Sequence, residues 1–244
     1  MTAREPERPA FYALRPGGWR DLVTLLHPPY TAWHLSYVVL GAAAAPTVHT
    51  DRVVAAVAAF GLAVGVGAHA LDELQGHPLR TGLSDRVLIA LAIGGLAGAV
   101  GIGIAGVLTV SATLIPFVAA GAFIALAYNL ELAGGRFHSD AWFAVAWGGF
   151  PALTSYWANA QTLRAPGVLV TAGCIALSAA QRRLSTPVRE LRRRTVSVTG
   201  EQQLTDGRTI ELTSARLAKP LDDALAALSA GVVLLAATAL LIRL

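Results

Sequence analysis

Hydrophobic residues in this chain are gathered into long, nearly uninterrupted runs that short polar segments separate. Each run approaches the length of about 20 residues that an α-helix needs to cross a bilayer. In hydrocarbon, each such helix satisfies its own backbone hydrogen bonds, whereas a soluble domain of this size does not need so many apolar runs. The pattern predicts an all-α integral membrane protein, a polytopic bundle of about seven transmembrane helices. The expected spans are residues 31–48, 52–71, 87–106, 108–128, 141–160, 166–181 and 223–242.

The third and fourth runs are almost continuous, and together they are far too long for one membrane helix. We therefore expect a tight turn near residues 106–109. Composition agrees with the membrane class, because 55% of the residues are hydrophobic and only 14% are charged. An ordinary soluble domain is about a quarter charged. Cys174, the only cysteine, lies inside an apolar run and is predicted to be a small packing residue.

Basic residues predict the orientation. With the N-terminus in the cytoplasm, 16 of the 19 Lys and Arg residues fall in cytoplasmic segments, and only Arg52, Arg164 and Arg243 fall outside. The positive-inside rule selects this arrangement, a multi-pass protein of the cell membrane. The net charge of +4 then reflects cytoplasmic loops and anionic lipid, and no basic groove with interleaved aromatic residues predicts nucleic-acid binding.

Four parts follow from these boundaries. They are a cytoplasmic N-terminal segment (1–30), a transmembrane bundle (31–181), a basic cytoplasmic loop (182–222) and a C-terminal transmembrane helix (223–244). In the basic loop, residues 195–199 and 209–213 alternate β-forming and polar residues around Asp206-Gly207, which predicts a small β-hairpin. Six arginines precede it, and they either meet lipid headgroups or bind a diphosphate. They are Arg182, Arg183, Arg189, Arg192, Arg193 and Arg194.

A polar cluster ends the second span. His69, Glu73 and His77 are spaced four residues apart, so a helix would place them on one face, with Asp72 beside it. Imidazoles and carboxylates are good ligands for divalent transition metals, and polar groups at this depth usually line a cavity. Alternatively, the cluster marks a helix end among the headgroups, because Pro78 disfavours helical geometry at His77.

A second polar cluster follows the fourth span and lies on the same side of the membrane. Tyr128, Asn129 and Glu131 end that span, and a loop with Arg136, His138 and Asp140 follows. The loop could complete a site with the first cluster, while Ser139 or Asp140 is also suited to cap the next helix. Within that next span, Trp147 and Phe150 are too deep for an interfacial belt, so they line a cavity or pack in the bundle.

Several segments together resemble one family. Arg15-Pro16-Gly17-Gly18-Trp19, Leu26-His27-Pro28 and Gly41 are similar to the amphipathic segment and first helix of the UbiA-type membrane prenyltransferase superfamily. The polar end of the second span stands where the family has N-x-x-x-D-x-x-x-D. Residues 77–84 (HPLRTGLS) resemble its R-P-L-x-x-G-x-x signature, and Tyr128 stands where it often has a tyrosine-led loop. The resemblance covers roughly residues 15–190.

The resemblance implies an enzyme that acts on an isoprenoid, a prenyl diphosphate or a related membrane lipid, with prenyl transfer as the reaction and Mg²⁺ as the cofactor. It places catalysis at Asp72, Glu73 and Tyr128 and a divalent metal at His69, Asp72, Glu73 and His77. The residues expected to bind substrate are Arg80, Asn129, Arg136, Arg182 and Arg183.

Three departures keep other interpretations open. His69 and His77 stand where the family has asparagine and aspartate, and histidine ligands favour zinc, iron or manganese over Mg²⁺. Arginines occupy the place of the family's second acidic motif, and the family usually has nine spans. A degenerate, non-catalytic protein that binds lipid, in an oligomer or with a partner subunit, is one alternative. A lipid enzyme of another reaction type, with a His/carboxylate metal, is the other.

The orientation gives a first prediction. In a Cys174→Ala background, a cysteine introduced by Val198→Cys should react with an impermeant thiol reagent only after the membrane is permeabilised, because its loop is expected in the cytoplasm. A cysteine introduced by Leu163→Cys, in an expected external loop, should react in intact cells. Labelling of the Val198→Cys variant in intact cells would contradict the orientation.

Overall fold

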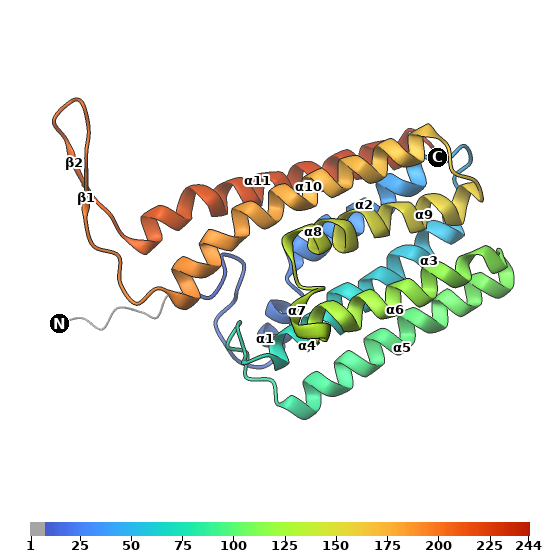
Figure 1. The fold of residues 1–244 in the computed structure, drawn as a ribbon, viewed down its shortest axis with the longest axis horizontal. Coiled ribbons are helices and arrows are strands. Elements are labelled where there is room, and N and C mark those ends of the chain that lie inside the picture. The colour runs from blue at the N-terminus through green and yellow to red at the C-terminus, as the bar shows by residue number, and fades with distance from the viewer. Residues whose placement is uncertain (1–7) are drawn as a thin grey trace.

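The structure, a computed structural model, describes residues 8–244, and it is built almost entirely of helices (Figure 1). The first half contains α1 (Trp19–Leu25), α2 (Pro28–Ala43), α3 (Thr50–Phe60), a π-helix (Gly61–Ala68), α4 (His69–Leu74), α5 (Asp85–Thr109), a 3₁₀ turn (Ala112–Leu114) and α6 (Ile115–Asn129). The second half contains α7 (Leu132–Gly135), α8 (Asp140–Phe143), a π-helix (Ala144–Gly149), α9 (Phe150–Ala160), α10 (Ala165–Arg189), a π-helix (Glu190–Arg194), β1 (Glu201–Gln203), β2 (Thr209–Glu211) and α11 (Ser214–Leu241).

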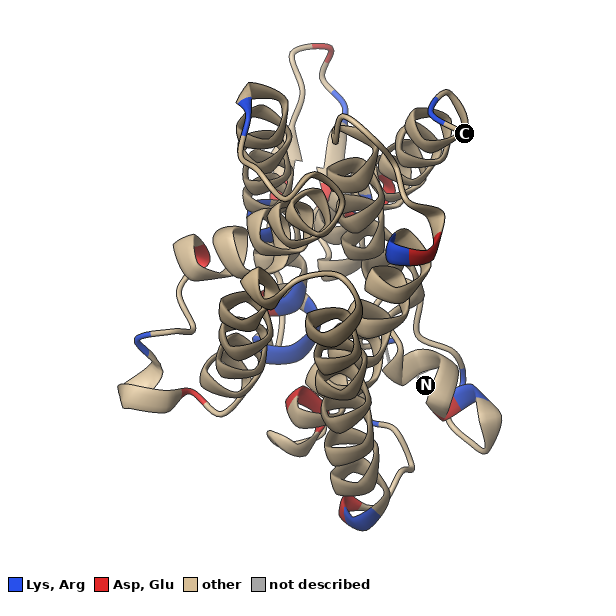
Figure 2. Cartoon of the chain, turned by 90° about the vertical axis from the view of Figure 1, so that its right-hand side faces the viewer, with Lys and Arg blue, Asp and Glu red and all other residues tan. Residues whose placement is uncertain are grey.

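Four of these helices are long and apolar enough to cross a membrane. They are Thr50–Leu74, Asp85–Thr109, Ala112–Asn129 and Ser214–Leu241. Their most hydrophobic stretches are mostly exposed on the outside of the bundle, as for Leu108 and Leu234, which are 80% and 67% exposed. Figure 2 shows helices with few charged residues along their lengths and most charges at their ends and in the loops. An apolar exterior of this kind requires lipid around it, so the membrane class is confirmed.

A helix or a continuous helical run also lies at each of the other three expected positions: α2, the run from α8 to α9, and α10. Since α2 has only 16 residues, it is shorter than a usual span. The number of seven spans therefore stays a prediction. A turn separates the third and fourth runs as expected, but it lies after residues 106–109, because α5 stays helical to Thr109. Ser111 then accepts a hydrogen bond from Thr113 N at 3.2 Å before α6 begins.

The bundle places the predicted loop segments at one end. In Figure 1, α10 and α11 run side by side, α2 and α9 lie beneath them, and α5 and α6 form the opposite edge. The end of α4, the start of α5, the end of α6 and the end of α10 all lie toward the same end as the hairpin. The segments rich in arginine therefore meet at one end of the molecule. Residues 1–7 of the expected N-terminal segment lie outside the described residues.

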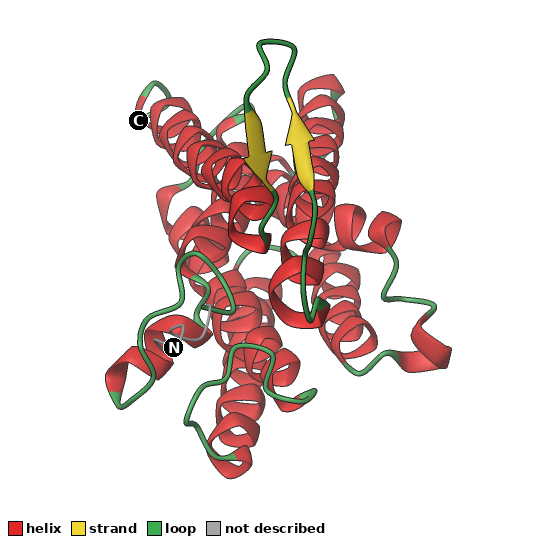
Figure 3. Ribbon diagram, turned by 90° about the vertical axis from the view of Figure 1, so that its left-hand side faces the viewer, coloured by secondary structure: helices red, strands yellow, loops and turns green. Residues whose placement is uncertain are grey.

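The hairpin predicted in the basic loop is confirmed, but its first strand is shifted. β1 pairs antiparallel with β2 in the register Glu201↔Glu211 and Gln203↔Thr209, and the hairpin projects from the bundle (Figure 3). Gly207 turns the chain at φ +83°. In this register residues 195–199 would face 213–217, which already form the cap and first turn of α11. The prediction of a strand at 195–199 was therefore wrong.

Close approach of two helix backbones fixes the centre of the bundle. A Cβ added at Gly41 of α2 would lie 2.1 Å from the carbonyl oxygen of Ala152 in α9. The adjoining core contains Trp33, Tyr37, Ala152, Cys174, Leu225 and Val232. Cys174 is 1% exposed and packs there, as predicted.

This contact gives a prediction of stability. Gly41→Ala should destabilise the protein by about 2–3 kcal/mol, because the methyl group overlaps a backbone carbonyl that cannot move aside. Gly173→Ala in α10 is the control, since a Cβ there meets nothing within 4 Å and alanine favours a helix. Thermal unfolding of both variants in the same detergent measures the difference. Equal stability of the two variants would contradict the close approach.

Candidate functional site

A polar cavity of about 140 Å³ lies among the helix ends near the hairpin side of the bundle. The N-terminal segment, α2, the α3–α4 run, the end of α6, α8 and the end of α10 all contribute to its wall. The polar and ionisable side chains in the wall are Tyr12, His27, Tyr30, His34, His69, Asp72, Tyr128, Asn129, His138, Gln181, Arg182, Ser185, Arg189, Arg193 and Asp222.

The cavity brings together some residues of the two predicted polar clusters. From the first cluster it includes His69 and Asp72, and from the second it includes Tyr128 and Asn129. The ring of His138 stacks on that of Tyr128 at 4.3 Å and its Nδ1 lies 3.1 Å from the Tyr128 carbonyl oxygen. The loop between α6 and α8 therefore closes one side of the cavity.

Glu73 and His77 do not line the cavity. Glu73 is completely buried, and its carboxylate accepts hydrogen bonds from Leu79 N at 2.9 Å, from Thr81 N at 3.0 Å and from Thr81 Oγ1 at 2.8 Å. These three bonds fix the loop that connects α4 to α5. In this structure the acidic group adjacent to Asp72 is a structural anchor for that loop.

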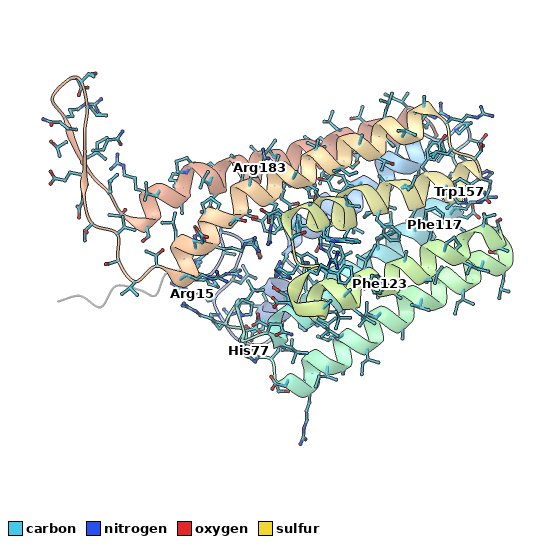
Figure 4. The ribbon with its side chains drawn as sticks, viewed as in Figure 1. Arg15, His77, Phe117, Phe123, Trp157 and Arg183 are labelled. Carbon is cyan, nitrogen blue, oxygen red and sulfur yellow. The ribbon has the colours of Figure 1, made fainter. Side chains whose placement is uncertain are left out.

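The predicted helical face ends before His77. α4 stops at Leu74, Gly76 and His77 have φ values of +88° and +51°, and the His77 ring turns toward Asp85 at 3.1 Å. Gly76 permits this reversal and Pro78 prevents the helix from continuing, so the prediction that His77 shares a helical face with His69 and Glu73 was wrong. Figure 4 shows His77 near the bottom of the bundle, in the loop after α4.

Three guanidinium groups belong to the cavity wall. Arg182 donates from Nε to Asp140 at 2.8 Å and lies over the Phe143 ring at 5.2 Å. Arg189 donates to Thr186 Oγ1 at 3.3 Å, and Arg193 Nε contacts the Pro9 carbonyl oxygen at 3.5 Å. A guanidinium carries five N–H donors, so these contacts leave donors for a ligand.

The positive charge in this wall is not fully compensated. Burial lowers the pKa of Arg189, and the nearby charges of Arg182 and Arg193 lower it further. Asp72 is within electrostatic reach of Arg189 and Arg193 but forms no hydrogen bond or ion pair with them in the described structure. An anion bound between these groups would relieve the mutual repulsion of the arginines.

Asp222, a second acidic residue of the cavity wall, is already engaged in an ion pair. Arg192 donates to Asp222 and links the end of α10 to α11, with both side chains largely buried.

Within residues 8–244, no group of three or more His, Cys, Asp or Glu side chains is placed to hold a metal ion. The metal site expected at the first cluster stays a prediction without a matching ligand set.

The predicted substrate-binding arginines divide into two groups. Arg182 lines the cavity, whereas Arg80, Arg136 and Arg183 are exposed and do not line it. Figure 4 shows Arg183 on α10.

Ser139 accepts a hydrogen bond from Trp142 N at 3.2 Å and so caps α8, which confirms the capping alternative for that residue.

Sequence reasoning did not find several cavity residues. His27, Tyr30 and His34 lie around the start of the first span, and only their polarity in an apolar neighbourhood pointed to a site. Arg189 and Arg193 were noted within the basic run, but nothing in the sequence distinguished them from Arg183. Their spacing along the helical end of α10 decides which side chains face inward.

An apolar cavity of about 300 Å³ adjoins the polar one. It lies between α3, α5, α6 and α9, and small residues and the rings of Phe60, Phe117 and Phe150 line it. At its far end the Phe117 ring stacks on Trp157, with centroids 5.9 Å apart (Figure 4). Of the two alternatives that the sequence left open, Trp147 and Phe150 line this cavity, and Trp147 also packs in the buried core.

Val64 and Trp147 line both cavities. Val64 belongs to the π-helix after α3, and Trp147 belongs to the π-helix after α8. π-Helical turns displace side chains from the regular helical positions and are frequent at functional sites. The two π-helices thus lie where the polar cavity adjoins the apolar cavity.

The anchoring role of Glu73 gives a prediction. Glu73→Gln replaces one acceptor oxygen by an NH₂ group that faces backbone donors, and it should destabilise the protein by about 2–3 kcal/mol. Hydrogen exchange should rise first at Leu79 and Thr81. Glu201→Gln in the exposed hairpin, which changes the charge equally, should leave stability unchanged. Wild-type exchange at Leu79 in the Glu73→Gln variant would disprove the anchor.

Comparisons of this chain with protein-family models, with curated proteins and with solved structures found no match.

Proposed function

We propose that this protein is a UbiA-like integral membrane enzyme that binds an isoprenoid diphosphate or a related anionic lipid and transfers its prenyl group. The observation that carries the proposal is the contact of the two cavities: an arginine-lined compartment adjoins an apolar one along Val64 and Trp147. A molecule with a phosphate head and a hydrocarbon tail matches both chemistries.

The head of such a lipid fits the arginine wall. Guanidinium groups bind phosphate oxygens through two parallel, charge-assisted hydrogen bonds, which a single lysine cannot reproduce. Arg182, Arg189 and Arg193 approach the cavity from one helical end, so they can contact several oxygens of one diphosphate. The tail would then pass Val64 and Trp147 into the apolar cavity, where burial of each methylene contributes about 0.8 kcal/mol.

The same wall supplies the charge compensation that prenyl transfer needs. When the bond between carbon and the diphosphate oxygen breaks, negative charge grows on the leaving group, and preorganised donors stabilise it. Asp72, in the same cavity wall, would stabilise positive charge on the prenyl carbon that the diphosphate leaves behind; this carbon then bonds to a nucleophilic atom of the acceptor, which gives up a proton. Tyr128 lies in the same wall.

The divalent metal implied by the family resemblance does not fit the described side chains as a resident ion. Asp222 is bound to Arg192, Glu73 is bound to the loop after α4, and Asp72 has no second carboxylate beside it in the cavity. We therefore derive charge compensation from the arginines alone.

A second candidate function is lipid binding without turnover, as a membrane subunit. The engagement of Asp222 and Glu73 in structural bonds favours it, because few acidic groups remain for catalysis. Both candidates need the same lipid site. In either case we propose a multi-pass protein of the cell membrane with seven spans and a cytoplasmic N-terminus, which places the polar cavity at the inner leaflet.

The arginine wall gives a prediction of affinity. Arg189→Ala and Arg193→Ala should each weaken binding of a non-hydrolysable prenyl diphosphate analogue about tenfold or more, because each removes charge-assisted hydrogen bonds. Binding is measured with the full chain in lipid nanodiscs, and it should survive partial removal of Mg²⁺.

Arg183→Ala and Arg136→Ala are matched controls, because both arginines are exposed and lie outside the cavity. Their affinities should stay within about twofold of wild type. If the analogue fails to bind at every Mg²⁺ concentration, the prenyl diphosphate proposal is excluded. Binding of the analogue without release of product from a prenyl diphosphate, across a panel of acceptors, would favour the non-catalytic candidate.

A further inference from the structure

Two buried polar atoms on residues that line the polar cavity have no hydrogen-bond partner among the described residues. Nε2 of His27 and Oε1 of Gln181 are each inaccessible and unpaired, and the two residues are only 9% and 2% exposed. They come from different parts of the chain, because His27 precedes α2 and Gln181 lies on α10, but both line the cavity. A buried polar atom without a partner typically costs about 1–3 kcal/mol.

The backbone at His27 is also unfavourable. His27 adopts the left-handed conformation at φ 46° and ψ 57°, and as the residue before α2 it makes no capping hydrogen bond with its side chain. A side chain other than glycine in this region costs of order 1–3 kcal/mol, and such residues cluster at ligand sites. The His27 side chain therefore does not serve as a cap of α2.

Neighbouring rings hold the His27 ring in place. It stacks on His69 with centroids 3.9 Å apart and planes 16° apart, and the Tyr12 ring lies 5.3 Å away. His69 is itself oriented by its Nδ1, 3.3 Å from the Gly65 carbonyl oxygen. The imidazole is therefore confined at the cavity wall.

Both side chains can accept a hydrogen bond. The imidazole of His27 accepts at Nε2 in the tautomer that carries its proton on Nδ1, and the Gln181 amide oxygen is an acceptor at any pH.

We infer that the cavity binds, beside the anion, a ligand group that carries an O–H or N–H donor, and that His27 and Gln181 recognise this group. The inference deepens the proposed function, because it assigns these two residues to selection of a protic second substrate. The arginines supply donors for the anionic head, whereas His27 and Gln181 supply acceptors. A purely apolar second ligand would leave both acceptors unpaired and is therefore disfavoured.

Phenol and toluene are suitable probes. They have nearly the same shape, and only phenol donates a hydrogen bond. The cavity volume of about 140 Å³ is close to that of an apolar cavity of about 150 Å³ that accepts benzene, so one ring fits. Binding to the full chain in nanodiscs is followed by the ¹⁵N resonances of labelled histidines, with empty nanodiscs as the control for partitioning into lipid.

The wild-type protein should prefer phenol to toluene by about tenfold, and phenol should shift the ring nitrogen resonances of His27. Gln181→Leu and His27→Phe should each reduce this preference severalfold, so that the ratio of phenol affinity to toluene affinity approaches one. Ser178→Ala is the matched control, because Ser178 Oγ is also buried and unpaired but does not line the cavity. Its phenol preference should equal that of wild type.

The thermal stability of the Gln181→Leu variant shows whether Gln181 recognises a ligand or only supports the fold. Without a ligand, Gln181→Leu should unfold at the same temperature as wild type or at a higher one, because it removes an unpaired acceptor. Lower stability together with an unchanged phenol preference would mean that Gln181 is structural. If His27→Phe does not fold, the Gln181→Leu variant and the wild-type resonances still decide the result.

Equal binding of phenol and toluene by the wild type, or a preference that persists in both variants, would overturn the inference. Neither probe contains phosphate, so this outcome is independent of the arginine experiments. The proposed function can fail at Arg189 and Arg193 while the donor site at His27 and Gln181 stands, and the reverse also holds.

Discussion

Polar groups inside an apolar helical bundle must find their partners within the protein, because hydrocarbon offers none. This constraint governs the end of the molecule at which the loops meet. Glu73 satisfies it by binding the loop after α4, and Arg192 satisfies it by binding Asp222 across α10 and α11. These bonds close the bundle end around a cavity whose remaining charged groups face one another without touching.

The charged side chains of the cavity that are not used in structural bonds decide which ligands it can bind. Arg182, Arg189 and Arg193 retain donors, and Asp72 retains a free carboxylate facing them. The arrangement is costly in the absence of a ligand, since like charges are held together by the end of one helix. Binding sites commonly contain such local instability, and the surrounding packing sustains it. Here the core at Trp33, Tyr37 and Cys174 and the close contact at Gly41 provide that packing.

Irregular helical turns connect this charged region to the apolar one. A regular α-helix repeats its side-chain directions every 3.6 residues, so one face stays apolar or polar along its length. The π-helices at Gly61–Ala68 and Ala144–Gly149 break that repeat at the depth where the two cavities meet. Val64 and Trp147 can therefore face both compartments. The two cavities therefore adjoin at these two irregular turns.

The sequence by itself determined the membrane class, the approximate positions of the helices and the presence of a hairpin in the basic loop, because apolar run length and turn residues are local properties of the chain. It also placed His69, Asp72, Tyr128, Asn129 and Arg182 near a common site, since alternate loops of a bundle meet at one end. Only the tertiary structure decided that Glu73 serves the loop and that His77 leaves the helix, because both depend on how residues 75–81 fold back. Tertiary structure likewise separated Arg189 and Arg193 from Arg183 and placed His27 and Gln181 in the wall of the same cavity, since which side chain faces a shared cavity depends on the rotation of each helix against its neighbours.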